Sequence, residues 1–129
     1  MDEVTIRRMT EGDTRAVWSI ENATFPTPWS LRDFEHEMRE NPCARYLVAV
    51  KDGTIIGFAG IHIILDEGHI TNIAVIDKER GRGIGRRLTE ALMQYAANLG
   101  VQYVTLEVRE NNEPAKNLYS SLGFFRVGV

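Results

Sequence analysis

The stretch Arg80-Gly81-Arg82-Gly83-Ile84-Gly85-Arg86 places three glycines at alternate positions, directly before a strongly amphipathic segment. Glycine permits backbone conformations in which successive N–H groups turn toward one point. The first turn of the helix that follows adds unpaired N–H donors and the positive end of its dipole. This arrangement is typical of a loop that binds phosphate or pyrophosphate. The alternative is a plain tight turn leading into a helix, because glycine clusters also occur by chance.

Basic side chains crowd this loop although the chain as a whole is acidic. The 129 residues carry a formal net charge of −3, whereas a general nucleic-acid binder is usually basic overall. Four arginines lie in or beside the loop: Arg80, Arg82, Arg86 and Arg87. We therefore expect a small polyanionic ligand and no direct nucleic-acid partner, with a solvated basic helix face as the alternative.

Length and composition predict a single domain over residues 1–129. The hydrophobic content of 43% and charged content of 26% are ordinary for a soluble protein, and no apolar run approaches the roughly 18 residues of a membrane span. The start Met1-Asp2-Glu3 does not have the pattern of a secretion signal, and the single cysteine, Cys43, cannot form an internal disulfide. We therefore expect a cytoplasmic location and no membrane partner.

Hydrophobic periodicity predicts the element order β-α-α-β-β-β-α-β-α, which indicates a mixed α/β sheet with helices on its faces. The expected strands cover residues 4–8, 46–50, 54–65, 69–75 and 101–108, and the expected helices cover about 10–20, 30–39, 84–99 and 112–122. Turns are expected at Asp52-Gly53 and at Asp66-Glu67-Gly68, a left-handed C-cap at Gly100, and a last extended segment from Phe124-Phe125. The segment Phe25-Pro26-Thr27-Pro28-Trp29 should be a non-helical loop because it contains two prolines.

Four linked segments resemble the GNAT superfamily of acyl-CoA-dependent N-acetyltransferases. They are Ile73-Ala74-Val75, the glycine loop, Leu106-Glu107-Val108, and Asn112 followed by Leu118-Tyr119 and Leu122-Gly123-Phe124. Four linked motifs match by chance far less often than one. The match is closest to the bacterial and archaeal branch that acetylates protein α-amino groups and includes the ribosomal-protein-alanine N-acetyltransferases. Three features carry that refinement: Phe25-Pro26 with Pro28-Trp29-Ser30, Leu65-Asp66-Glu67 before Asn72-Ile73-Ala74-Val75, and Leu106-Glu107-Val108-Arg109 ahead of Asn112.

The resemblance implies the GNAT fold and a site for acetyl-CoA formed largely by the backbone. The residues that would hold the CoA pyrophosphate are Gly81, Arg82, Gly83, Ile84, Gly85 and Arg86. Ile73, Ala74 and Val75 would pair with the pantetheine arm as with an added strand, and an N–H near Val75 would polarise the thioester oxygen. Asn112 would hydrogen-bond the same arm from the other side, with a simple helix N-cap as the alternative.

The resemblance also implies the groups that move protons. Glu107 would accept the amine proton through water, and Tyr119 would protonate the departing CoA thiolate. The alternatives are a surface carboxylate and a core aromatic side chain. Phe25 and Trp29 are candidates for a wall of the acceptor groove, although core packing explains two aromatic residues equally well. The three histidines show no metal-ligand spacing, so no metal is expected.

The implied function is transfer of acetyl from acetyl-CoA to the N-terminal α-amino group of a protein, by direct attack in a ternary complex. The expected acceptor is a ribosomal protein that begins with alanine. The alternatives are acetylation of lysine side chains or small amines, and a non-catalytic CoA-binding module. Family members normally continue past the Gly123-Phe124 motif through another strand, whereas this sequence stops at Val129. We therefore expect a shortened or missing C-terminal strand and a homodimer through that edge as one way to cover it.

Overall fold

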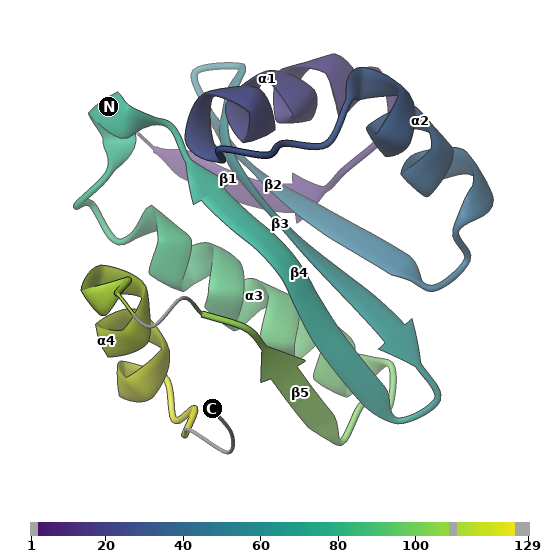
Figure 1. The fold of residues 1–129 in the computed structure, drawn as a ribbon, viewed down its shortest axis with the longest axis vertical. Coiled ribbons are helices and arrows are strands. Elements are labelled where there is room, and N and C mark those ends of the chain that lie inside the picture. Colours follow the sequence, from purple (N-terminus) through teal and green to yellow (C-terminus); the bar gives the residue numbers. More distant parts are fainter. Residues whose placement is uncertain (1–2, 109–110, 126–129) are drawn as a thin grey trace.

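The computed structural model describes residues 3–108 and 111–125, in which one five-stranded sheet carries helices on both faces (Figure 1). The strands are β1 (Val4–Arg8), β2 (Ala44–Lys51), β3 (Thr54–Ile64), β4 (Glu67–Val75) and β5 (Tyr103–Leu106). The helices are α1 (Thr14–Thr24), α2 (Leu31–Glu40), α3 (Ile84–Asn98) and α4 (Glu113–Ser121), with short 3-10 helices η1 (Glu11–Asp13) and η2 (Asp77–Glu79). The spatial order is β1-β2-β3-β4-β5, antiparallel except for the parallel β4–β5 pair. The predicted order of elements is confirmed.

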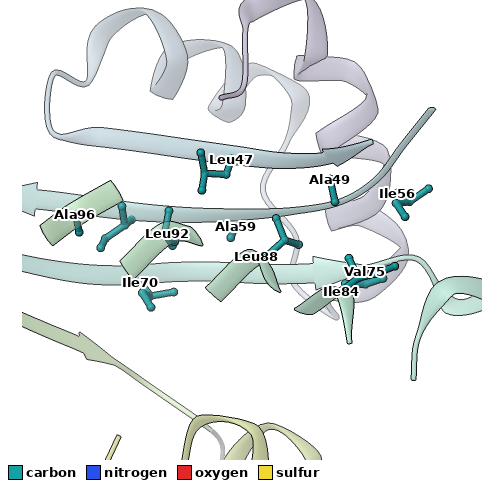
Figure 2. Packing of buried hydrophobic residues seen from close by; sticks show 11 residues of the cluster. Leu47, Ala49, Ile56, Ala59, Ile70, Val75, Ile84, Leu88, Leu92 and Ala96 are labelled. Atoms are coloured by element: carbon teal, nitrogen blue, oxygen red, sulfur yellow. The ribbon is translucent and has the colours of Figure 1, made fainter. Parts of the chain in front are cut away.

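Alternate residues of the central strands face opposite layers of helix. Leu47 and Ala49 of β2 pack with α3, whereas Tyr46 and Val48 pack with α1 and α2. Figure 2 shows the row that α3 presents to β2, β3 and β4, formed by Ile84, Leu88, Leu92 and Ala96. The α3 face is built from aliphatic residues, whereas the other face contains an aromatic cluster centred on the fully buried Phe34.

A bulge in β4 changes which of its side chains face α3. Gly60 of β3 is opposite Asn72, but Ile61 is opposite Ile70, so Thr71 is an extra residue in β4. The bulge reverses the alternation, and Ile70 and Val75 therefore both pack in the cluster on the α3 side. It thus redirects the end of β4 that leads to the glycine loop.

The position of the β3–β4 turn and the length of β5 both differ from the predictions. The β3–β4 turn lies at Leu65-Asp66, where Leu65 has a φ of +57°, and Glu67 and Gly68 already belong to β4. Strand β5 is shorter than the predicted 101–108, because its pairing with β4 ends at Ile70 and Leu106, directly before the bulge. The carbonyl oxygen of Asp66 instead accepts the N–H of residues 102 and 103 and holds the start of β5.

Other local predictions are confirmed. Asp52 and Gly53 both have positive φ in the β2–β3 turn, and Gly100 has a φ of +89° after α3. Of the expected last extended segment, Phe124 and Phe125 form no strand, and residues 126–129 lie outside the described part of the chain, as does the edge invoked for a homodimer. Among the described residues, no helix has the length and apolar character needed to cross a membrane.

Candidate active site

Among the described residues, strand β4 has neighbours on both sides in its first half only. Glu67 to Ile70 pair with both β3 and β5, whereas Asn72 to Val75 pair with β3 alone (Figure 1). The Ile76 N–H donates to the Ile56 carbonyl on β3 at 2.9 Å. Because backbone groups alternate in an antiparallel ladder, Ala74 also bonds toward β3, and the polar groups of Ile73 and Val75 point to the side without a strand.

Arg80 binds the backbone at the end of β4, on the side that has no neighbouring strand in the described part of the chain. Its Nε donates to the Val75 carbonyl at 3.0 Å, and its Nη1 lies 2.6 Å from a carboxylate oxygen of Asp77. The Val75 carbonyl is therefore occupied by the protein itself. The Val75 N–H and both backbone groups of Ile73 remain as the groups on this side that could bind an extended ligand.

The glycine loop has the geometry of an anion site. Gly81 and Gly83 both have a φ of +79°, in the left-handed region, and Gly83 is the N-cap residue of α3. The Arg87 N–H donates to the Gly83 carbonyl at 3.0 Å, so the N–H groups of residues 84–86 precede the first helical hydrogen bond. A Cβ atom built on Gly81 or Gly83 would meet no atom within 4 Å. The space beside these two glycines is therefore open, and the residues fit a pyrophosphate.

A buried carboxylate anchors the loop to the sheet. Glu79 of η2 accepts from Lys51 Nζ at 3.0 Å, and Arg82 Nη1 lies 3.4 Å from its other oxygen. The hydrogen bond from Lys51 lowers the pKa of the Glu79 carboxyl below its ordinary value. A cavity of about 160 Å³ adjoins this cluster and is also lined by Arg87. The positive charge of Arg82 is thus held in place beside the loop, with its side chain still 56% exposed.

Helix α4 docks on the first turn of α3. Arg86 Nη1 donates to Ser121 Oγ at 2.7 Å, and Leu118 Cδ2 would lie 3.9 Å from a Cβ atom on Gly85. Tyr119 therefore belongs to a helix in contact with the candidate phosphate site. Its ring packs edge-on against Phe124, with 5.9 Å between centroids, and burial raises the pKa of its phenol. The side chain keeps its proton at neutral pH, as a general acid must.

Glu107 and Asn112 lie on either side of the segment 109–110, which the structure does not describe. Glu107 follows the last residue of β5 and is exposed, like Thr105 before it, whereas Leu106 is half-buried. The Asn112 side chain accepts the Ala115 N–H at 3.2 Å and caps α4. The cap is therefore confirmed, and the second role of Asn112, toward CoA, stays a prediction.

The two aromatic residues of the early loop are half-buried. Phe25 and Trp29 pack against the cluster under α1 and α2, and the Trp29 ring lies 5.1 Å from that of Phe34. Core packing thus accounts for much of each side chain. A contact of either residue with an acceptor stays a prediction.

Sequence reasoning missed Glu21, a buried carboxylate beside this loop. Only 4% of Glu21 is exposed. Its side chain accepts the Trp29 N–H at 3.1 Å and the Asn72 amide N–H at 3.0 Å. A signal was present in the sequence, because Val17, Ile20 and Glu21 share one stripe of a helix and the carboxylate takes an otherwise apolar position.

Comparison with known proteins identifies the family. The model of the Acetyltransferase (GNAT) family matches residues 14–124. This chain belongs to that family. It is 38% identical over 120 residues to the ribosomal protein bS18-alanine N-acetyltransferase of Salmonella typhimurium, which covers 93% of this chain and 80% of that protein. It is also 37% identical over 134 residues to the N-alpha-acetyltransferase RimI of Mycobacterium tuberculosis, covering 99% of this chain and 82% of the relative.

A solved GNAT structure has the same fold. The ribosomal-protein-S18-alanine N-acetyltransferase from Escherichia coli matches with a TM-score of 0.90 and 32% identity, covering 98% of this chain and 80% of that one. The resemblance seen in the sequence and the expected GNAT fold are therefore confirmed. The protein is an N-acetyltransferase, and acetyl-CoA is the co-substrate of the family reaction. Among residues 3–108 and 111–125, no group of three or more potential ligands could hold a metal ion.

Proposed function

We propose that this enzyme acetylates the N-terminal α-amino group of a protein, and that its acceptor is a ribosomal protein that begins with alanine. The single observation that carries the proposal is the half of β4 that pairs, among the described residues, with β3 only and leads to the glycine loop and the first turn of α3. The names of the relatives support the acceptor, since two are ribosomal-protein-alanine N-acetyltransferases. A cytoplasmic location follows from that acceptor and is part of the same proposal.

The residues that hold the donor are backbone groups for the most part. The N–H groups from Gly81 to Arg86 bind the pyrophosphate, and the adjacent arginines add positive charge. The backbone of Ile73 to Val75 pairs with the pantetheine arm along the unpaired edge, and the Val75 N–H polarises the thioester carbonyl. Asn112 bonds the arm from the side of α4.

Acetyl-CoA supplies an acetyl group on a thioester, and this chain supplies the positions and the proton transfers. The acceptor nitrogen attacks the thioester carbonyl carbon, a C–N bond forms, and the C–S bond breaks. Glu107 takes the proton that leaves the amine, through a water molecule, and Tyr119 gives its phenol proton to the departing sulfur. No covalent acyl-enzyme is required, because both substrates are held together.

The exposure of Glu107 favours an α-amine over a lysine side chain. An α-amino group with a pKa of about 7.7 to 8.0 is partly neutral at physiological pH, whereas a lysine amine with a pKa of about 10.4 is almost entirely charged. Glu107 is exposed and acts through water, so it is suited to the weaker demand. The acceptor that needs least assistance is therefore the one proposed.

Initial rates with three acceptors test this proposal. The protein is given acetyl-CoA with a synthetic alanine-initiated peptide from a ribosomal protein, with an N-terminally blocked lysine peptide, or with spermine. The proposal requires the highest kcat/KM for the alanine-initiated peptide. Preference for lysine or spermine would assign a different acceptor. Tight CoA binding without turnover of any amine would instead indicate a non-catalytic CoA-binding module.

A further inference from the structure

We propose that Glu21 is a positioning residue that sets the place of the acceptor relative to the bound acetyl group. Its carboxylate joins the loop that carries Phe25 and Trp29 to β4 at Asn72, one residue before the segment that pairs with the donor. The inference rests on the proposed function, because it assigns the loop to the acceptor side of the site. It adds a residue that acts through others and touches neither substrate.

Glu21 accepts hydrogen bonds from both ends of the loop. Its backbone carbonyl accepts the Phe25 N–H at 3.0 Å, where α1 ends, and its Oε2 accepts the Trp29 N–H at 3.1 Å. The first and the last residue of the loop from Phe25 to Trp29 are therefore both hydrogen-bonded to Glu21. A shift of the Glu21 side chain would move the whole loop.

The second oxygen of Glu21 joins the loop to the bulge of β4. Oε1 accepts from Nδ2 of Asn72 at 3.0 Å, while Oδ1 of Asn72 accepts from the Thr71 hydroxyl at 2.7 Å. Thr71 is the extra residue of the bulge, and its hydrogen bond directs the Asn72 amide with its N–H toward Glu21. The loop and the start of the donor edge are thus held by a single carboxylate.

The partners of Glu21 are all neutral, which is costly for a buried carboxylate. Among the described residues, no ion pair includes Glu21, and both of its oxygens accept hydrogen bonds from neutral N–H groups. A buried charge depends on such bonds for its stabilisation. Loss of either donor would therefore move the carboxylate, and with it the spacing between the loop and β4.

Glu37 provides a matched control on the same face of the sheet. It is 6% exposed and lies in α2, where it bonds Asn41, Tyr46 and His62. Burial raises the pKa of the Glu37 carboxyl, but the hydrogen bonds from these side chains outweigh it, and the pKa lies below its ordinary value. Glu37 resembles Glu21 in residue type and burial, and its own hydrogen bonds reach neither the loop nor β4; only its partner Tyr46 in turn interacts with Thr71 of β4.

Exchanging the carboxylate of Glu21 and the amide of Asn72 tests the inference. In Asn72→Asp, two carboxylates face each other, and we expect the acceptor KM to rise at least tenfold while the Kd of CoA stays within about threefold of the original. In the double variant Glu21→Gln with Asn72→Asp, the new amide at position 21 can donate to the new carboxylate at position 72 and accept from Trp29. We expect the double variant to return to within about threefold of the original KM.

The control variant Glu37→Gln should lower the Tm and leave the acceptor KM within about twofold, because it loosens the same face without touching the loop. The inference is overturned if Asn72→Asp leaves the acceptor KM unchanged, if the double variant fails to restore it, or if Glu37→Gln raises it equally. A general loss of stability cannot explain a restored acceptor KM in the double variant, because the losses caused by the two substitutions would then add.

Hydrogen exchange separates this inference from the proposed function. Failure of the proposed function would appear in the unmodified protein, as absence of peptide acetylation. Whether or not the protein acetylates the peptide, the Trp29 amide should exchange at least tenfold faster in Glu21→Ala than in Glu37→Ala. Only the first substitution removes the carboxylate that accepts the Trp29 N–H. Equal exchange in the two variants would show that Glu21 does not hold the loop.

Discussion

The two halves of β4 have different neighbours although they belong to one strand. From Glu67 to Ile70 the strand lies between β3 and β5, and from Asn72 to Val75 it pairs with β3 alone within residues 3–108 and 111–125. The change occurs at the Thr71 bulge, which also reverses the side-chain alternation. One extra residue thus divides the strand into a half that is paired on both sides and a half with a free edge.

The difference indicates how one strand serves both stability and binding. Backbone groups of the paired half are used by the sheet, whereas those of Ile73 and Val75 are directed away from β3. An open edge can accept an extended ligand by adding a strand. The glycine loop and α4 lie at the open end and not at the paired end, so substitutions in the two halves should have separable effects.

The largest expected effect comes from the loop at the open end. Gly83→Val should lower the affinity for CoA at least about a hundredfold, equivalent to about 2.7 kcal/mol, because a branched side chain at the N-cap of α3 would enter the open space beside the loop, where the pyrophosphate is proposed to bind. Calorimetric titration with CoA measures the change.

Gly100→Val is the control for backbone strain in that experiment. Gly100 has a φ of +89°, close to the +79° of Gly83, and a Cβ atom there also meets nothing within 4 Å. It lies after the far end of α3, so its substitution should reduce stability and leave the affinity for CoA unchanged. Equal losses of affinity in both variants would refute the assignment of the loop.

The second effect concerns the phenol of α4. Tyr119→Phe should lower kcat about a hundredfold, because the raised pKa keeps a proton available for the leaving sulfur and phenylalanine has none. The Kd of CoA should change by less than about twofold, since the phenol acts on the reaction and not on the bound cofactor.

Tyr103 is the matched tyrosine of the paired end. It is the first residue of β5, stands opposite Glu67, and is 61% exposed. Tyr103→Phe should leave kcat unchanged in steady-state assays. A normal kcat in Tyr119→Phe would move the general acid to another group and weaken the distinction between the two ends.

Much of the fold could be predicted because its signals are local. The helix from Ile84 shows apolar residues at helical spacing and ends before a glycine with positive φ, and all of this is contained in the segment itself. The turn at Asp52-Gly53 and the cap at Asn112 are local in the same way. The family motifs placed the candidate site on β4, the loop and α4 for the same reason.

The features that escaped prediction depend on contacts between distant segments. The end of β5 is set by the bulge at Thr71, more than thirty positions earlier in the chain. Glu21 acquires its place from Asn72, 51 residues away. Periodicity within one segment contains no information about which residue of another strand is the extra one, or which donor will reach a buried carboxylate.

The third effect is a change in pH dependence. Glu107→Gln should lower kcat/KM about tenfold at pH 7, because only about a tenth of the α-amine is neutral there. At pH 9 the amine is already neutral, so the same substitution should lower kcat/KM by about twofold or less. Activity that is lost at low pH should thus be recovered as the pH rises. The exposed Glu67 at the paired end is the control, and Glu67→Gln should leave the whole pH profile of kcat/KM in place. A loss in Glu107→Gln that is the same at every pH would contradict a base.

The smallest effect tests the paired half by packing. A Cβ atom on Gly68 would lie 2.7 Å from Cδ1 of Ile61, the flexible end of that side chain, so Gly68→Ala should cost about 1 kcal/mol of unfolding free energy and leave CoA affinity unchanged. Gly57 is the counterpart in the open half, because it pairs with Val75 and its Cβ atom would lie 2.9 Å from the Ala74 carbonyl.

Backbone cannot rotate away as a side chain can, so Gly57→Ala should displace the donor edge and weaken CoA binding several-fold beside its cost in stability. Urea unfolding and CoA titration of both variants measure the two quantities. If both glycine substitutions weakened CoA binding equally, the two halves of β4 would be mechanically coupled, and the division at Thr71 would not separate binding from stability.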